Sequence, residues 1–241
     1  MTLPGQRPIR VTVTYYMKIY KSYFLLIIVC LAFIVSATCQ ANEIEKKFIE
    51  AGLVNIHVID ESIKVDLVNS DPGKNYFREN YYDGLHKAYL RREVAQKLSL
   101  AQKHLKSEFP EYSILIMDAA RPRAVSKLMF EKMKGTKFEK YVANPKNGSM
   151  HNYGIAVDVS IVDANGQEID MGFTPFYKSD LSIYWGFAKL KMLDLSKAQK
   201  KNRKLLSDVM KKAGFIPLSY EWWHFDGMPK DEARKKYQII E

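Results

Sequence analysis

Two stretches of the chain carry apolar residues at the three- or four-residue spacing of an amphipathic helix. In residues 88–109 the apolar stripe consists of Leu90, Val94, Leu98, Ala101 and Leu105. In residues 196–213 it consists of Leu205, Leu206, Val209 and Met210, and Gly214 follows as a helix stop. The pattern predicts two long helices, each with one face against a hydrophobic core.

Two shorter helices are predicted from the signals at their ends. Asn42 is a good N-cap for a helix through Ala51, which Gly52 then ends. Pro122 suits the first turn of another helix, which stops before Gly135. Both helices connect segments that read as strands or turns.

Strands are expected where apolar residues alternate or form short runs. These segments are residues 56–67, 113–117, 155–162 and 215–225. Because helices and strands are mixed without regular β–α–β alternation, the predicted fold class is α+β in a single domain. The polar, turn-rich residues 69–84 also contain four aromatic side chains, which either pack back on the core or line a cleft.

An uncharged and mostly apolar segment lies near the N-terminus. The continuous apolar run covers residues 23–35, whereas a membrane-spanning helix needs about 20 residues. Lys18 and Lys21 precede it and small residues follow it, which is typical of a secretory signal peptide. We therefore expect a leader over residues 1–41, cleaved after Ala41, and one domain over residues 42–241 that is exported to the periplasm or cell envelope.

Some details of the leader stay open. Met17 begins the signal in the usual way, which favours it as the true translation start. An uncleaved anchor and lipid attachment at Cys39 are the alternatives to cleavage. Membrane contact is expected only through these two routes.

The composition limits which partners are expected and which interactions can stabilise the domain. The 241 residues have a formal net charge of +10, and loss of the leader's four basic residues lowers it to +6. Export and this mild charge argue against a nucleic-acid partner. They suit anionic wall polymers or lipid headgroups, and equally a surface that only keeps the protein soluble. Both cysteines, Cys30 and Cys39, lie in the leader, so the mature domain depends on its core, with a metal as one further support.

The segment from Gly148 to Asp158 combines a histidine and a carboxylate. His151 and Asp158 are seven residues apart, so on one straight strand they would point to opposite faces. The residues 152–154 can supply a bend that lets the two side chains converge. Asp158 lies within an apolar strand pattern and needs a partner, which is either a cation or a set of structural donors.

A second polar pair, Glu221 and His224, lies among four aromatic residues. Alone, it reads equally as a structural Glu–His pair. Together, His151, Asp158 and His224 supply the three protein ligands of a catalytic zinc site with an open fourth position. Glu221 is then left as a carboxylate that can take a proton from a water and pass it on. The combination predicts a metallohydrolase with one zinc ion per chain.

A third segment, residues 118–123, places Arg121 at a strand-to-helix junction. A guanidinium held there could stabilise an oxyanion or bind a carboxylate. Arginines at such junctions are also common surface residues, and this alternative stays open.

Three motifs in this order resemble the D-alanyl-D-alanine dipeptidase family of zinc peptidases. They are Asp-Ala-Ala-Arg-Pro (118–122), Ser-x-His-x-x-Gly-x-Ala-x-Asp (149–158) and Glu-Trp-Trp-His (221–224). The resemblance implies an α+β fold with a central antiparallel sheet that carries the metal, and hydrolysis of D-Ala-D-Ala to two D-alanines in peptidoglycan metabolism.

The resemblance also implies the roles of individual residues. Zinc would be bound by His151, Asp158 and His224. Glu221 would be the general base and acid, Arg121 would stabilise the tetrahedral intermediate, and Ser149 would face the substrate.

One departure from the family bears on the substrate. The family commonly has Phe-Asp after its Met-Gly motif, and that Asp helps to receive the substrate's amino group. Here Phe176 is followed by Tyr177, with Asp180 as a candidate substitute. The alternative of a D,D- or L,D-carboxypeptidase acting on cell-wall peptides therefore stays open.

Two further classes are compatible with parts of the pattern. Two histidines and one carboxylate also hold iron in some oxygenases, but six residues separate the first two ligands here and Glu221 would have no role. A non-enzymatic wall-binding module that keeps zinc for structure is the other alternative.

Overall fold

The computed structural model describes residues 42–136, 139, 144–172, 195–219 and 221–241 of the chain. The leader predicted over residues 1–41 lies outside the described residues, as do Tyr177 and Asp180. Glu43–Glu241 forms one compact unit. Within the described ranges, no helix is both long and apolar enough to cross a membrane.

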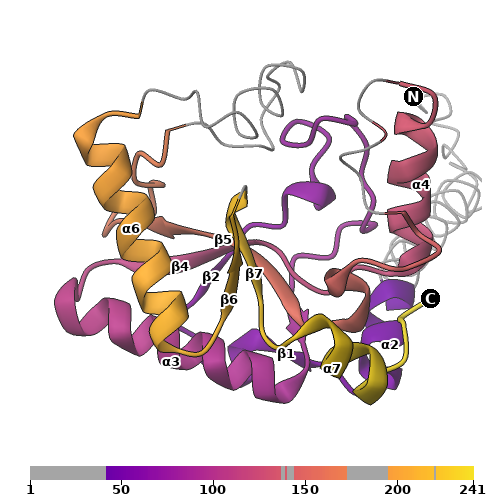
Figure 1. The fold of residues 1–241 in the computed structure, drawn as a ribbon, viewed down its shortest axis with the longest axis horizontal. Coiled ribbons are helices and arrows are strands. Elements are labelled where there is room, and N and C mark those ends of the chain that lie inside the picture. The colour runs from indigo at the N-terminus through magenta and orange to yellow at the C-terminus, as the bar shows by residue number, and fades with distance from the viewer. Residues whose placement is uncertain (1–41, 137–138, 140–143, 173–194, 220) are drawn as a thin grey trace, which may run out of the picture. The chain divides into compact units, whose positions relative to one another are not determined.

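The centre of this unit is a sheet with the strand order β2-β4-β5-β7-β6 (Figure 1). Its strands are β2 (Lys64–Val65), β4 (Ser113–Asp118), β5 (Ala156–Val162), β7 (Glu221–Asp226) and β6 (Ile216–Leu218). Strands β4, β5, β7 and β6 pair antiparallel, whereas β2 runs parallel to β4. The predicted α+β class is confirmed, with the difference that the sheet is mixed rather than purely antiparallel. A parallel pair requires a long crossover, and the chain between β2 and β4 supplies it.

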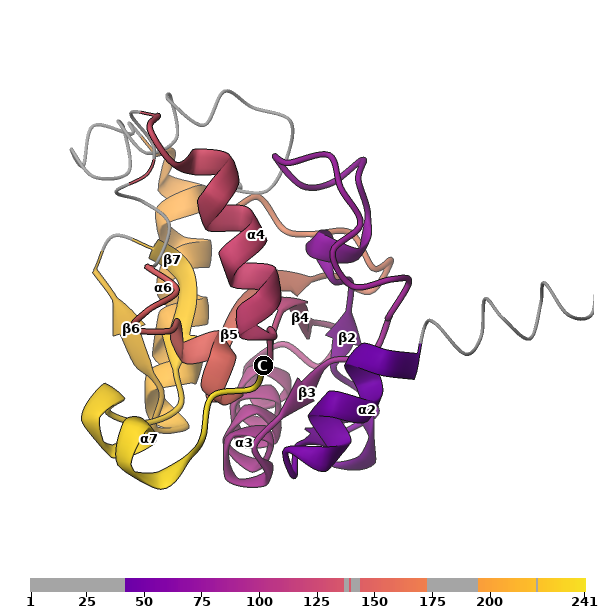
Figure 2. The same ribbon diagram turned by 90° about the vertical axis from the view of Figure 1, so that its right-hand side faces the viewer.

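Two long helices cover one side of the sheet. They are α3 (Arg92–Glu108) and α6 (Lys197–Lys212), which pack against each other, α3 also against β4 and α6 against β6 and β7. Figures 1 and 2 show α4 (Arg123–Met133) on the opposite side of the sheet. The described residues also form the helices α2 (Asn42–Glu50) and α7 (Lys230–Lys236). The four helices predicted from stripes and caps are thus confirmed, with ends shifted by a few residues.

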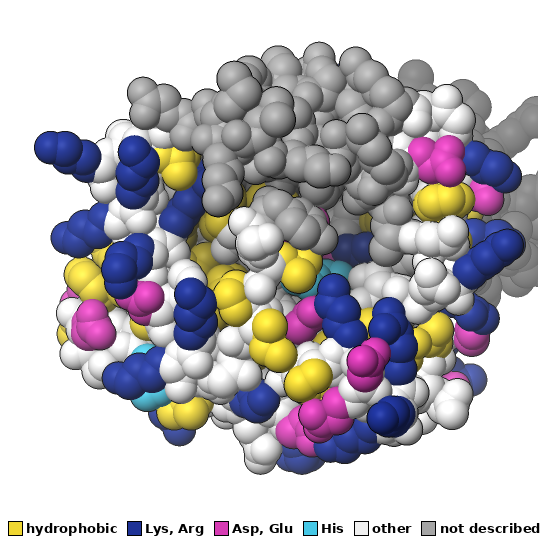
Figure 3. Space-filling view, viewed as in Figure 1, with side chains coloured by type: hydrophobic (Ala, Val, Ile, Leu, Met, Phe, Trp, Pro, Cys, Tyr) yellow, Lys and Arg dark blue, Asp and Glu magenta, His cyan; other side chains and the backbone are white. Residues whose placement is uncertain are grey.

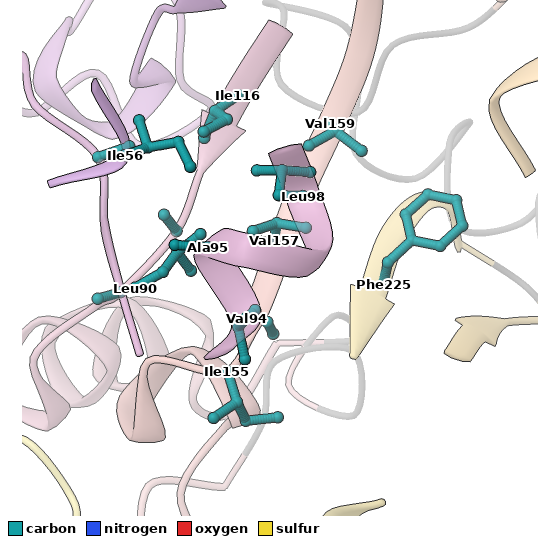
Figure 4. Close-up of a cluster of buried hydrophobic side chains, with 14 of the residues drawn as sticks. Ile56, Leu90, Val94, Ala95, Leu98, Ile116, Ile155, Val157, Val159 and Phe225 are labelled. Carbon is teal, nitrogen blue, oxygen red and sulfur yellow. The ribbon is translucent and has the colours of Figure 1, made fainter. Parts of the chain in front are cut away.

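The hydrophobic core lies between α3 and the sheet. Val94 and Leu98 of α3 and Val157 and Val159 of β5 are fully buried and belong to one cluster (Figure 4). Full burial of each such side chain contributes about 1.5–3 kcal/mol. All seven residues of β5 are buried, so any charged group on this strand lies in a dry environment.

Two segments differ from the sequence-based expectation near the N-terminal edge. Residues 56–58, predicted as strand, form a short 3₁₀ helix, because the Asn55 side chain accepts a hydrogen bond from the backbone N–H of His57 and caps it. The helix predicted from residue 88 begins only at Arg92, because Tyr89–Leu90 (β3) pairs with Val54–Asn55 (β1). Leu90 is nevertheless fully buried, so its place in the apolar stripe reflects burial in a strand.

Candidate metal centre

His151 lies on a single 3₁₀ turn, Met150–Tyr153, that leads into β5. Ser149 caps this turn through a reciprocal pair of hydrogen bonds with Asn152 and the turn's backbone. Gly154 then reverses the chain with a φ of 70°. A Cβ at this position would lie 2.8 Å from the Leu53 Cδ2 atom, so both the backbone angle and the space require glycine. This is the bend that the sequence suggested for residues 152–154.

Asp118, Asp158 and His224 lie in one row across three neighbouring strands. Asp158 of β5 is the register partner of both Asp118 of β4 and His224 of β7. Residues directly opposite each other on adjacent strands project from the same face of a sheet. Val157 and Val159, the neighbours of Asp158, face the α3 side instead (Figure 4). The ionisable side chains of this row therefore lie together on the face of the sheet opposite to α3.

The 3₁₀ turn brings His151 to this row. His151 Nε2 lies 3.4 Å from Asp158 Oδ1 and 3.2 Å from His224 Nδ1, and the Asp158–His224 distance between the same atoms is 2.9 Å. All three residues are buried. Histidine and acidic side chains are visible near the middle of one face in Figure 3.

The spacing and chemistry of these three atoms fit a metal ion. Tetrahedral zinc with bonds of about 2.0–2.1 Å separates its ligand atoms by about 3.3 Å, and the three distances lie around that value. Two imidazole nitrogens and one carboxylate oxygen match the donor set of a catalytic zinc site. The structure thus brings together the three residues that the sequence proposed as ligands.

Each imidazole is oriented by a hydrogen bond on its far nitrogen. His151 Nδ1 lies 2.7 Å from the backbone oxygen of Ala119, and His224 Nε2 lies 3.0 Å from Asp226 Oδ1. When these nitrogens donate, Nε2 of His151 and Nδ1 of His224 are left to face the site as acceptors. Sequence reasoning missed Asp226, although its i, i+2 spacing from His224 within a strand was the signal that could have identified it.

The surroundings of Asp158 and His224 favour the charged form of each side chain. Burial alone would raise the pKa of Asp158, but His151 and His224 outweigh it and hold that pKa well below its usual range. Burial would lower the pKa of His224, whereas hydrogen bonds to Asp158 and Asp226 raise it to about 10. In the metal-free protein the site therefore keeps a proton on His224 that a metal ion would have to displace.

Glu221 reaches the same cluster from the start of β7. Its Oε2 atom lies 3.9 Å from His224 Nδ1. Residues three apart on a regular strand face opposite sides, but the pairing of β6 with β7 shifts register between Pro217 and Leu218. Burial raises the pKa of Glu221, which suits a carboxylate that must accept a proton and later give it up.

Arg121 is held beside the site by a buried carboxylate. Its Nε donates to Asp118 Oδ2 at 3.0 Å, and its Nη2 forms an ion pair with the same oxygen. The backbone N–H of Arg121 donates to the carbonyl of His151 at 3.0 Å. The Arg121 side chain is only 15% exposed. Burial would lower the pKa of Arg121, but Asp118 raises it above its ordinary value. Arg121 is therefore a fixed cation rather than a mobile surface residue.

The long segment between β2 and β3 also contributes to this pair. The Tyr82 hydroxyl donates to Asp118 Oδ1 at 2.7 Å, and Asn69 Nδ2 donates to Asp118 Oδ2 at 2.9 Å. Both residues are buried. Among the four aromatic side chains of residues 69–84, Tyr81 and Tyr82 are buried in the core and Phe77 packs against it, whereas Tyr76 is exposed. Tyr82 also helps to anchor the arginine. Neither Asn69 nor Tyr82 was a candidate from sequence alone.

Ser149, which the resemblance assigns to the substrate, has a structural role as the cap of the 3₁₀ turn. Its hydroxyl accepts the backbone N–H of His151 at 3.2 Å, and its side chain is partly exposed. The hydroxyl hydrogen is not used by this bond, so contact with a substrate stays a prediction.

Comparison with known proteins also indicates a peptidase. A family model described as Peptidase_M15, D-ala-D-ala dipeptidase, matches residues 51–240. The D-alanyl-D-alanine dipeptidase of Escherichia coli (strain K12) is 28% identical over a match that covers 55% of this chain and 61% of that protein. The D-alanyl-D-alanine dipeptidase of a Synechocystis strain is 27% identical, with coverage of 60% of this chain and 71% of that protein.

A solved structure of the LdcB LD-carboxypeptidase is more distant. It aligns with a TM-score of 0.34 and 20% identity, over 61% of this chain and 63% of that chain. A likeness this weak supports no conclusion about fold or function. The match to the Escherichia coli relative also spans less than two thirds of that protein.

Proposed function

Because the chain belongs to the D-Ala-D-Ala dipeptidase family of peptidases, we propose that it is a zinc-dependent dipeptidase that hydrolyses D-Ala-D-Ala to two D-alanines. Its place in peptidoglycan metabolism and its export to the periplasm or cell envelope are parts of this proposal. Members of the family are metallopeptidases. The observation that carries the proposal is the convergence of His151, Asp158 and His224 with Glu221 beside them.

The metal would be held by the inward-facing atoms of the three ligands, His151 Nε2, Asp158 Oδ1 and His224 Nδ1. A bound zinc ion would supply Lewis acidity and lower the pKa of a water in its open position. Burial of all three ligands keeps bulk water away from the charges, which strengthens their interactions.

The chain's other residues would carry the proton and the charge. The Glu221 carboxylate accepts a proton from the water that attacks the peptide carbonyl, and then gives it to the nitrogen of the leaving D-alanine. The Arg121 guanidinium stabilises the oxyanion that develops when the C–O bond forms. Its fixed position on Asp118 means that no reorganisation is needed when that charge appears. Ser149 is proposed to contact the substrate through its hydroxyl.

The test compares two substrates with the purified protein loaded with zinc. Turnover of free D-Ala-D-Ala supports the dipeptidase. If only a muropeptide pentapeptide is cleaved, the proposed substrate is wrong and a wall-peptide carboxypeptidase replaces it. If neither is cleaved, a non-enzymatic wall-binding module gains support.

The variant Glu221→Gln separates catalysis from metal binding. We expect hydrolysis to fall by about 10²–10⁴-fold, while zinc content and melting temperature change little. Glu111→Gln, at an exposed glutamate, is the matched control and should retain full activity. Unchanged hydrolysis in Glu221→Gln would remove the general base from the mechanism.

A further inference from the structure

Asp226 is a buried carboxylate next to the cluster that the proposed reaction does not use. It is 2% exposed and is the last residue of β7. Its side chain accepts a hydrogen bond from His224 rather than facing the other two ligand residues. A buried carboxylate is costly unless its partners compensate for its desolvation, so its partners indicate what it does.

The sheet places Asp226 beneath the imidazole of His224. Residues two apart on a strand project from the same face. The backbone of Asp226 is paired on both sides, with Ala156 of β5 and Ile216 of β6. The carboxylate is therefore as rigidly placed as the histidine that it contacts.

The two oxygens of Asp226 have different partners. Oδ1 lies 3.0 Å from His224 Nε2, and Oδ2 lies 3.8 Å from Lys230 Nζ. The other ionisable groups of the cluster, His151, Asp158 and Glu221, lie on the Nδ1 side of the His224 ring. The imidazole is thus held between a carboxylate behind it and the ion-binding cluster in front.

We propose that Asp226 is a positioning residue that fixes His224 with Nε2 protonated and Nδ1 turned toward the metal. This inference rests on the proposed metal centre. A carboxylate acceptor makes the imidazole a stronger electron donor than a neutral acceptor does, so it increases metal affinity. The corresponding partner of His151 is the uncharged backbone carbonyl of Ala119. The two histidines are therefore unequal ligands. At His224 a side chain determines how strongly the imidazole donates electrons to the metal.

The experiment measures zinc affinity by competition with a chelator, using the full protein after metal removal. Removal of such a partner typically weakens metal binding about 10–100-fold, and we expect a loss in this range for Asp226→Ala. For Asp226→Asn we expect a smaller loss, because the amide oxygen still accepts the Nε2–H bond but carries no charge. Lys230→Met is the matched control, since it removes the Lys230 contact and leaves the His224 bond intact; its affinity should match the unaltered protein.

A second readout distinguishes positioning from general packing. Proton and nitrogen NMR of the zinc-loaded protein reports the hydrogen bond of the His224 Nε2–H. We expect a downfield, slowly exchanging Nε2–H signal in the unaltered protein and in Asp226→Asn, where an oxygen still accepts this bond, and loss of that signal in Asp226→Ala. If Asp226→Ala does not fold, Asp226→Asn alone decides the question, because its side chain has nearly the same volume.

Zinc affinity of Asp226→Asn and Asp226→Ala equal to that of the unaltered protein would overturn the proposal. The proposed function can fail separately. If D-Ala-D-Ala is not cleaved but Asp226→Asn binds zinc more weakly, the activity is wrong and the positioning role stands. If the unaltered protein binds no zinc, both are wrong.

Discussion

Replacement of Asp118 by Asn is expected to destabilise the protein by about 3–5 kcal/mol, the range for breaking one side of a buried ion pair. Asp118 is fully buried and accepts hydrogen bonds from Tyr82, Asn69, the backbone of Ala119 and the guanidinium of Arg121. Every one of these partners is a donor. An Asn amide supplies one oxygen and one NH₂ group, so in either orientation the NH₂ group faces donors and the charge of Arg121 loses its counterion.

A milder substitution at the same site provides a comparison for the loss of stability. Tyr82→Phe removes one hydrogen bond of 2.7 Å to Asp118 and leaves the ring in place. A hydrogen bond to a charged group contributes about 1.5–3 kcal/mol. Because Asp118 keeps its charge in this variant and still holds Arg121, activity should be nearly unchanged. Asp118→Asn should instead lower kcat, since the guanidinium loses its fixed position.

The assay is urea denaturation in the presence of a chelator, so that metal binding does not contribute to the free energy of unfolding. A double-mutant cycle combines Asp118→Asn with Arg121→Met. We expect a coupling energy of at least about 1 kcal/mol, because the double variant no longer buries an unpaired cation. Additive free energies, or a smaller loss for Asp118→Asn than for Tyr82→Phe, would refute the reasoning.

Two further predictions follow from the metal cluster and its turn. In the metal-free protein the pKa of His224 is raised to about 10 from an ordinary value of 6.5, so its contribution to stability is fully present below pH 6.5 and is lost as the pH rises through about 10. The melting temperature of chelator-treated protein should therefore fall between pH 7 and 10, and a flat profile in that window would contradict the assignment. Gly154→Ala should destabilise the protein by about 1–3 kcal/mol, because its φ of 70° and the contact with Leu53 both oppose a side chain. Denaturant unfolding measures this loss, zinc affinity should fall with it as His151 shifts, and stability equal to that of the unaltered protein would contradict it.

The parts of the site that could be predicted from sequence are those that depend on local signals. Asp158 stood out because a charge interrupts an apolar strand, and the structure shows that strand buried on both sides. The glycine and polar residues before Asp158 indicated the bend that brings His151 close to Asp158 and His224. These signals lie within ten residues of one another, so one short window contains them.

The rest depends on long-range pairing that a local pattern does not contain. Tyr82 and Asp118 are 36 residues apart, and Asn69 and Asp118 are 49 apart. Their contact exists only because β2 joins the sheet parallel to β4, which no alternation of residues indicated. The capping of residues 56–58 by Asn55 likewise replaced a strand by a tighter turn, since a side-chain hydrogen bond competes locally with pairing between strands.

The row of Asp118, Asp158 and His224 spans the middle of the sheet rather than its loops. Backbone amides in a paired central strand exchange with solvent only when much of the domain opens. Asp158 and His224, separated by 66 residues in the chain, can therefore part only if β5 and β7 part. The geometry of the candidate metal site therefore persists for as long as the sheet itself stays folded. The loops around the sheet can change in evolution without disturbing it.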